Sequence, residues 1–511
     1  MNSERSQNPF LLALLTVGML AALSQLPAGL TIGGVALRPV RLLADVLRRP
    51  SAAEAAADVA DLPPPNGPAA PVDTTAAVVA PPDSTELAAK TLGPPVANLG
   101  GLDSFLAALR QAKATGRKVR VAYFGDSMIE GDLITGDLRN SLQQEFGGTG
   151  VGYVPIGSVA ADFRATVHET NSGNWLSYDL VSAKLPAQFP LGLSGHVFVP
   201  RMPRAATDST PASAGGSWVS YQAGGPWAAV RRFEQARLFY GPGAATDVVR
   251  VTANNRTVPH PLPGALGANE LVLTPNPAAR QMRFDFDVHA PRPVYGVSFE
   301  SPGGVTLDNF SFRGNSGMSL TRIPFKELAA FGKLQPYDLI ILHYGVNVAS
   351  ARVRDFGWYE RAMTRVVDRL QRAFPQASVL IVGMSDKSAR IDGEFVTDPS
   401  VPRLLAAQRR LAERNHAAFW NLFEAMGGEN SMVSWVEEAP ALANRDYTHV
   451  NARGARKMAG LLFDYLMTEY NHPSQLAPAG AAPPAPATPV PAATPTPAAD
   501  TATEAPAATH R

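Results

Sequence analysis

The stretch VRVAYFGDSMIEGDLITGDLR, residues 119–139, decides how the rest of this sequence is interpreted. Its apolar run at residues 119–124 predicts a buried strand, and residues 131–146 have the apolar spacing of a helix. Between them lies the tripeptide Gly125-Asp126-Ser127. These residue types are common in turns and as helix caps, so a turn with an N-cap is the simpler explanation. The alternative is that Ser127 is a nucleophile at the end of a strand, and the tripeptide alone does not decide between them.

The composition is that of a globular protein without a strong electrostatic preference. The chain has 511 residues, enough for two or three domains, of which 45% are hydrophobic and 17% are charged. Its 45 basic and 44 acidic residues give a net charge of +1, so we expect no nucleic-acid partner. The sequence contains no cysteine, which excludes disulfides and cysteine-based metal sites. Its histidines and carboxylates show no metal-ligand spacing, so we expect no metal.

The N-terminal segment, residues 1–50, contains an uncharged stretch at residues 10–37. Its densest apolar part, residues 10–26, is near the lower limit for crossing a bilayer. We interpret the segment as an uncleaved signal anchor with its flank; a cleaved signal peptide is the alternative, but no convincing A-x-A cleavage site follows. Four arginines after the stretch, taken alone, favour the reverse orientation: Arg38, Arg41, Arg48 and Arg49. We expect a periplasmic or otherwise extracytoplasmic protein held at the inner membrane, because the chemistry inferred below suits the cell envelope.

The remaining chain divides by composition. Residues 51–98 and 471–511 are rich in proline and alanine without any period, and we expect a disordered linker and a disordered tail. Residues 99–148 and 309–470 alternate helical spacing with strands that are apolar on both faces, which predicts a parallel α/β sheet. Residues 149–308 contain short alternating runs punctuated by turn residues, ending with VTLDNFSF. They predict a β-sandwich module inserted into one doubly wound α/β domain.

Polar residues follow several of the predicted α/β strands. In open parallel sheets, functional groups gather at the carboxyl ends of the strands. The candidates are Ser127 after the first strand, Asn347 in HYGVN, Asp446 and His449 in NRDYTHVNARG, and Gly314 and Gly317 in FRGNSGMSL.

Serine hydrolysis needs a base beside the hydroxyl, an acid that orients the imidazole, and donors for the oxyanion. We expect Ser127 to be the nucleophile, His449 the base and Asp446 the orienting acid, because an aspartate and a histidine three residues apart in a loop can meet. The amides of Ser127 and Gly317 and the side chain of Asn347 are the expected oxyanion donors, with Gly314 as the competing glycine. Asp126 is expected to brace the turn.

These blocks resemble those of the SGNH (GDSL-like) hydrolase superfamily, which is named after a serine, a glycine, an asparagine and a histidine. Gly125-Asp126-Ser127 resembles its first block, GNSG its second, GVN its third and DYTH its fifth, in the family's order. The resemblance implies a flavodoxin-like three-layer fold and a serine esterase that needs no cofactor. Two departures stand out: Val348 occupies the place of the aspartate that usually ends the third block, and the second block lies far downstream of the first.

An insertion between the first two blocks is similar to that of bacterial peptidoglycan O-acetylesterases, whose inserted domain resembles a carbohydrate-binding module. It implies an acylated cell-envelope glycan, such as peptidoglycan, as the substrate that loses an O-acetyl or other short acyl group. Four aromatic residues either stack on sugars or fill the sandwich core: Trp175, Trp218, Trp227 and Tyr240. The alternatives are an O-acyltransferase using the same site, a non-catalytic glycan-binding scaffold and, less favoured, a lipase.

Overall fold

The computed structural model describes residues 31–32, 35–36, 96–97, 101–157, 161, 164–201 and 216–472. The chain separates into two compact units, Met1–Ala80 and Pro81–Arg511. In the first, the described residues form a short antiparallel pair, β1 (Thr31–Ile32) and β2 (Val35–Ala36). The expected anchor core at 10–26 and tail at 473–511 lie outside the described residues, as does the linker apart from residues 96–97. No helix within the described ranges is long and apolar enough to span a bilayer.

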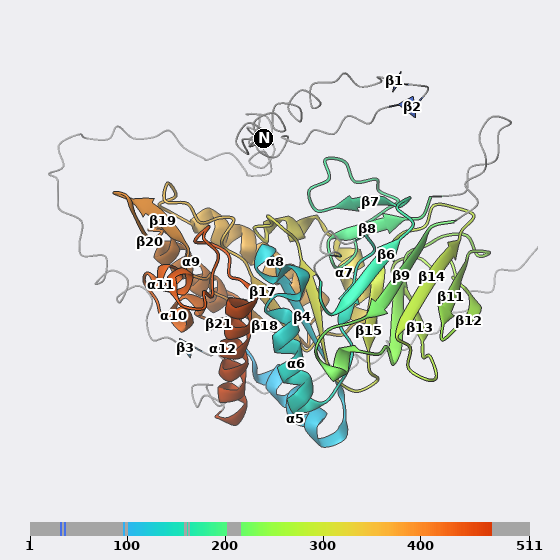
Figure 1. Cartoon of the computed structure of the whole chain (residues 1–511), viewed down its shortest axis with the longest axis horizontal. Coiled ribbons are helices and arrows are strands. Elements are labelled where there is room, and N and C mark those ends of the chain that lie inside the picture. Colours follow the sequence, from blue (N-terminus) through green and yellow to red (C-terminus); the bar gives the residue numbers. More distant parts are fainter. Residues whose placement is uncertain are drawn as a thin grey trace, which may run out of the picture. The chain divides into compact units, whose positions relative to one another are not determined.

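A mostly parallel sheet forms the centre of the α/β part of the second unit (Figure 1). Its strands, in spatial order, are β16 (Gly304–Ser311), β4 (Lys118–Gly125), β17 (Leu339–His343), β18 (Ser378–Val382) and β21 (Ala418–Trp420), with β3 (Val96–Ala97) antiparallel at the edge. Every residue of β17 and β18 is buried, which explains their continuous apolar sequences. The parallel strands follow the flavodoxin-like order 2-1-3-4-5, so the expected fold class is confirmed.

Helices cover this sheet in two layers, which with the sheet make the expected three-layer fold. On one face α5 (Asp103–Thr115), α6 (Thr135–Phe146) and α12 (Ala452–Asn471) pack together; on the other lie α7 (Phe325–Leu334), α8 (Gly357–Ala373) and α9 (Ser400–Arg414). The shorter α10 (Leu422–Met426) and α11 (Ser431–Glu437) follow β21. A hairpin, β19 (Ser388–Ile391) and β20 (Glu394–Thr397), extends beyond β18.

The inserted β module consists of two antiparallel sheets. The first contains β13 (Asn269–Leu273), β10 (Gln235–Tyr240), β15 (Val294–Glu300), β8 (His196–Val199), β7 (Leu176–Asp179) and β5 (Gly152–Val154). The second contains β12 (Arg256–Pro261), β11 (Val248–Ala253), β14 (Gln281–Asp287), β9 (Trp218–Ala223) and β6 (Val167–Asn171). Alternate residues of β14 are buried, as a strand with one face on a core requires. Aromatic contacts from Phe239 and Tyr295 to Phe331 of α7 join this module to the α/β part.

The structure corrects the expected boundary at residue 308, which falls inside β16. VTLDNFSF was interpreted as a sandwich strand, but it pairs with β4 in parallel register from Gly304↔Lys118 to Ser311↔Gly125. Its polar residues produced the misleading alternation, because Thr306, Asp308 and Asn309 are buried rather than exposed, and the side chains of Asp308 and Asn309 are hydrogen-bonded. The carboxylate of Asp308 accepts bonds from the Tyr153 amide at 2.8 Å and the Tyr337 hydroxyl at 2.6 Å.

A second correction concerns the segment after Ser127. The spacing predicts a helix over residues 131–146, but α6 begins only at Thr135, and a short 3-10 segment, η1 (Ser127–Asp132), precedes it. Positive φ angles of 65° at Gly131, 70° at Asp132 and 60° at Ile134 interrupt the helical path. The N-terminus of α6 therefore lies beyond this break rather than directly after Ser127.

Candidate active site

Ser127, His449 and Asp446 lie side by side although Ser127 comes from the end of β4 and the other two from the loop before α12. The hydroxyl oxygen of Ser127 is 3.0 Å from Nε2 of His449. On the other side of the imidazole, Nδ1 of His449 is 2.7 Å from Oδ2 of Asp446. This is the order of contacts that a nucleophile, a base and an orienting acid require.

The loop that carries Asp446 and His449 is tied to itself by backbone hydrogen bonds. Oδ1 of Asp446 accepts from the amides of Thr448 at 3.0 Å and His449 at 2.9 Å, and the Asn444 amide donates to the His449 carbonyl at 2.8 Å. Next to it, Tyr447 has a φ of 53° and stacks on Phe395 of β20, with ring centroids 3.7 Å apart. The hairpin, which sequence reasoning missed, therefore supports the loop that positions the imidazole.

The electrostatics of this loop favour one tautomer of His449. Partial burial raises the pKa of Asp446, but the backbone amide and imidazole of His449 outweigh it and hold that pKa below its usual value. The carboxylate is therefore ionised at neutral pH and accepts the proton-bearing Nδ1 of His449. Nε2 is left as an acceptor facing the Ser127 hydroxyl, which is the orientation that proton abstraction needs.

Asp126 braces the turn as the sequence suggested, and it also holds Asn347. Its Oδ1 accepts from the Met128 amide at 3.0 Å, and its Oδ2 accepts from Nδ2 of Asn347 at 2.9 Å. The side chain is buried, and burial raises its pKa to about 6. Asn347 is thereby fixed at the end of β17, beside the strand that carries Ser127.

Two of the three donors expected for the oxyanion, the side chain of Asn347 and the amide of Gly317, are hydrogen-bonded to protein groups in this structure. Nδ2 of Asn347 also donates to the carbonyl of Asn315 at 3.1 Å, while the amide of Gly317 donates to Oδ1 of Asn315 at 2.9 Å. Asn315, which lies within GNSG but is not among the site residues predicted from the sequence, therefore links both groups. No periodicity or spacing marks it in the sequence.

The two candidate glycines differ in their surroundings. Gly317 is buried with a φ of 90°, and a Cβ there would lie 2.8 Å from Tyr344 and 2.9 Å from Met363. Gly314 is exposed, with a φ of 76° and nothing within 4 Å of such a Cβ. Gly317 is thus the glycine that lies in the network of Asn315 and Asn347.

The four aromatic residues that were considered for sugar stacking lie within or against the β module. Tyr240 is buried in its core, and Trp175 and Trp227 pack against that core. The ring of Trp218 lies under the Arg283 guanidinium, 4.0 Å from centroid to Cζ. The structure therefore favours the packing alternative for three of the four.

The comparisons with known proteins identify a hydrolase family for part of the chain. Residues 288–457 match the GDSL-like Lipase/Acylhydrolase family model, and this range includes Gly317, Asn347, Asp446 and His449. Ser127 precedes the matched range because the β module separates it from the other blocks. Residues 288–457 are thus a GDSL-like (SGNH-type) hydrolase domain, and the class of enzyme is carboxylic ester hydrolase.

Among solved structures, one described as "Peptidoglycan O-acetylesterase in action, 5 min" shares the fold. It aligns with a TM-score of 0.57 and 24% identity over 72% of this chain and 96% of its own. A family two carbohydrate esterase from Cellvibrio japonicus aligns over 60% of this chain and 99% of its own, at 9% identity and a TM-score of 0.23. No curated protein matches the sequence.

Proposed function

We propose that this chain is a serine esterase that removes O-acetyl or other short acyl groups from a cell-envelope glycan such as peptidoglycan. The observation that carries the catalytic part is the line of contacts from the Ser127 hydroxyl through His449 to Asp446. The glycan part is supported by the fold shared with the structure described as a peptidoglycan O-acetylesterase. We further propose export and anchoring through the N-terminal segment, since such a substrate lies outside the cytoplasm.

The reaction begins with proton transfer from Ser127 to Nε2 of His449 as the serine oxygen attacks the ester carbonyl carbon. The carbonyl π electrons move to its oxygen, and Asp446 stabilises the imidazolium. Collapse of the tetrahedral intermediate breaks the ester C–O bond, and the sugar oxygen leaves with the proton from His449. Water, deprotonated by His449, then attacks the acyl-serine and releases the carboxylic acid and free Ser127.

The oxyanion is stabilised by the amides of Ser127 and Gly317 and by Nδ2 of Asn347. In the described structure the latter two donate to Asn315 and Asp126. A developing oxyanion competes well with the neutral acceptors of Asn315, because hydrogen bonds to a charged oxygen are about twice as strong. Full stabilisation then arises only as charge develops, which is the differential binding that accelerates a reaction.

The test is acetate release from a panel of substrates: O-acetylated peptidoglycan, O-acetylated xylan and p-nitrophenyl acetate. We expect the wild type to act on all esters but with the highest kcat/KM on peptidoglycan. Ser127→Ala should abolish every activity, and Ser141→Ala on α6 serves as the matched control. Hydrolysis of p-nitrophenyl acetate alone would refute the glycan substrate, and acetyl transfer to chitooligosaccharides in preference to water would identify an acyltransferase.

A further inference from the structure

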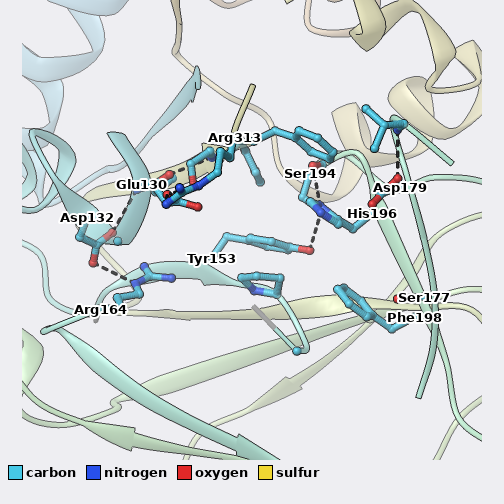
Figure 2. A pocket seen from close by; sticks show the side chains of 18 residues that line it. Glu130, Asp132, Tyr153, Arg164, Ser177, Asp179, Ser194, His196, Phe198 and Arg313 are labelled. Atoms are coloured by element: carbon cyan, nitrogen blue, oxygen red, sulfur yellow. Dashed lines mark hydrogen bonds and ion pairs between the residues drawn. The ribbon is translucent and has the colours of Figure 1, made fainter. Parts of the chain in front are cut away.

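A pocket of about 410 Å³ lies between the β module and the α/β part (Figure 2). One wall is formed by η1, the end of β16 and the two residues after it; the other comes from β5, β7, β8 and the residues between them. Its volume is within the usual range for sites that bind small molecules. None of the residues singled out in the sequence for catalysis lines it.

Some residues that line the pocket are close in sequence to Ser127, and one directly precedes the loop of Gly314 and Gly317. Glu130 and Asp132 line it and belong to the same short 3-10 segment as Ser127. Arg313 lines it and directly precedes the loop of Gly314 and Gly317. Nε of Arg313 donates to Oε2 of Glu130 at 2.9 Å, which joins the two segments at the pocket wall. A ligand held here would therefore contact the segments that position the reacting groups.

Arg164 offers this pocket an unused cationic donor. Its side chain is 6% exposed, its Nε donates to Oδ2 of Asp132 at 3.0 Å, and its Nη2 is buried without a partner among the described residues. Asp132 is already bonded by Arg139, with Nη2 at 2.9 Å from Oδ2. Two guanidinium groups thus share one carboxylate, so the cluster of these three side chains carries a net charge of +1. A buried donor of this kind is expected to have an acceptor, preferably an anion.

The other carboxylates that line the pocket already have donors. Glu130 is paired with Arg313, and Oδ1 of Asp179 accepts from the Val181 amide at 3.0 Å and the Ser182 hydroxyl at 2.9 Å. Of the buried side-chain polar atoms that line the pocket in the described chain, Nη2 of Arg164 is the one left without a partner. The missing acceptor is therefore expected to come from a ligand.

His196 supplies the complementary acceptor together with a flat surface. Its Nδ1 is 3.1 Å from the Ser194 carbonyl, which can only accept, so Nδ1 carries the proton and Nε2 is an acceptor. Burial lowers the pKa of His196, which keeps the ring neutral at pH 7. The ring stacks on Phe312 at 5.0 Å and on Phe198 at 6.0 Å between centroids. Figure 2 shows Arg164 and His196 on opposite sides of Tyr153, and all three residues line the pocket.

We propose that this pocket is a subsite for an acidic saccharide unit of the ester substrate, in which Nη2 of Arg164 binds a carboxylate and Nε2 of His196 accepts a hydrogen bond from a hydroxyl. The proposal rests on the glycan esterase function proposed above and specifies that its substrate carries a carboxylate near the ester. Flat non-polar rings combined with a few directed polar groups are the chemistry that a sugar ring requires.

The test compares kcat/KM on four acetyl esters in the full chain. They are O-acetylated peptidoglycan fragments with peptide stems, the same fragments after an amidase has removed the stems and left the lactyl carboxylate, neutral O-acetylated chitooligosaccharides, and p-nitrophenyl acetate. We expect Arg164→Gln, which keeps a donor for Asp132, to lower kcat/KM about 10- to 100-fold on at least one carboxylate-bearing substrate. The neutral sugar and p-nitrophenyl acetate should be unaffected. The carboxylate-bearing substrate whose kcat/KM falls identifies which carboxylate is bound.

A second variant keeps the subsite testable if Arg164→Gln fails to fold. His196→Phe keeps the aromatic stack but removes the acceptor, and it should weaken hydrolysis of all three saccharides while sparing p-nitrophenyl acetate. Arg250→Gln, in an exposed ion pair with Asp287 on the same module, is the matched control. Equal losses on charged and neutral substrates for Arg164→Gln, or no loss on either carboxylate-bearing one, would overturn the subsite. A wild type that hydrolyses p-nitrophenyl acetate but no glycan would instead remove the proposed function itself.

Discussion

Asn347 donates a hydrogen bond from its side-chain amide to the buried carboxylate of Asp126, with 2.9 Å between Nδ2 and Oδ2. This bond ties the end of β17 to the turn after β4, at the point where the strand order of the sheet reverses. Asn347 itself is exposed, whereas Asp126 is 1% exposed. Asp126, next to the proposed nucleophile, therefore holds Asn347, a proposed oxyanion donor, and the two groups can be tested separately.

Asp126 should make stability depend on pH in a defined direction. Burial raises its pKa from 3.8 to about 6, so the folded protein binds this proton more tightly than the unfolded chain does. The resulting stabilisation is fully present below about pH 4 and is lost as the pH rises through about 6. Relative to Asp126→Asn, the wild type should lose about 3 kcal/mol of unfolding free energy over that interval. Urea unfolding at successive pH values measures this, and a difference that does not change with pH would contradict it.

Asn347→Ala should reduce kcat about 10²- to 10³-fold with a small change in KM, because a transition-state donor is lost. Asn347→Asp should be at least as damaging, since it places a second carboxylate against Asp126. Steady-state kinetics with p-nitrophenyl acetate separate kcat from KM. Retention of most of the wild-type kcat in both variants would exclude Asn347 from the oxyanion site.

Gly317→Ala and Gly314→Ala form a matched pair. At Gly317 a Cβ would lie 2.8 Å from Tyr344, in addition to the strain of a φ of 90°, so we expect a loss of about 2–3 kcal/mol and a large fall in kcat. Gly314 has open space around it and should lose only about 1 kcal/mol, with kcat retained. Thermal unfolding and esterase rates measure both effects. A loss of kcat in Gly314→Ala but not in Gly317→Ala would reverse the assignment.

Asp446→Asn should lower kcat about 10²- to 10³-fold, because a neutral amide no longer fixes the tautomer of His449 or stabilises its charged form. Its stability should hardly change, since this side chain is 49% exposed. The exposed Asp464 on α12 provides the control variant Asp464→Asn. Kinetics and thermal unfolding of the two variants decide the point: equal activity in both would remove Asp446 from the proposed catalytic group.

The sequence predicted the parallel sheet well because β17 and β18 are apolar on both faces, and a continuous apolar run has few other structural meanings. It failed at β16, where buried Asp308 and Asn309 imitate a half-exposed strand. It also failed after Ser127, where non-glycine residues such as Ile134 adopt positive φ angles that propensity does not anticipate.

Within the site, the proximity of Asp446 and His449 followed from local spacing. The linking position of Asn315 and the open donor of Arg164 depend on tertiary contacts between distant segments, and neither has a local pattern in the sequence. The same holds for Phe395, whose stacking on Tyr447 joins a hairpin to the histidine loop.

Covalent labelling tests most directly whether Ser127 is the nucleophile. The full chain is treated with a fluorophosphonate probe, and the adduct is located by mass spectrometry of its peptides. We predict one adduct, on Ser127, with labelling abolished in Ser127→Ala and strongly slowed in His449→Ala. An adduct on another residue, or a Ser127→Ala variant that still hydrolyses p-nitrophenyl acetate at the wild-type rate, would contradict this prediction.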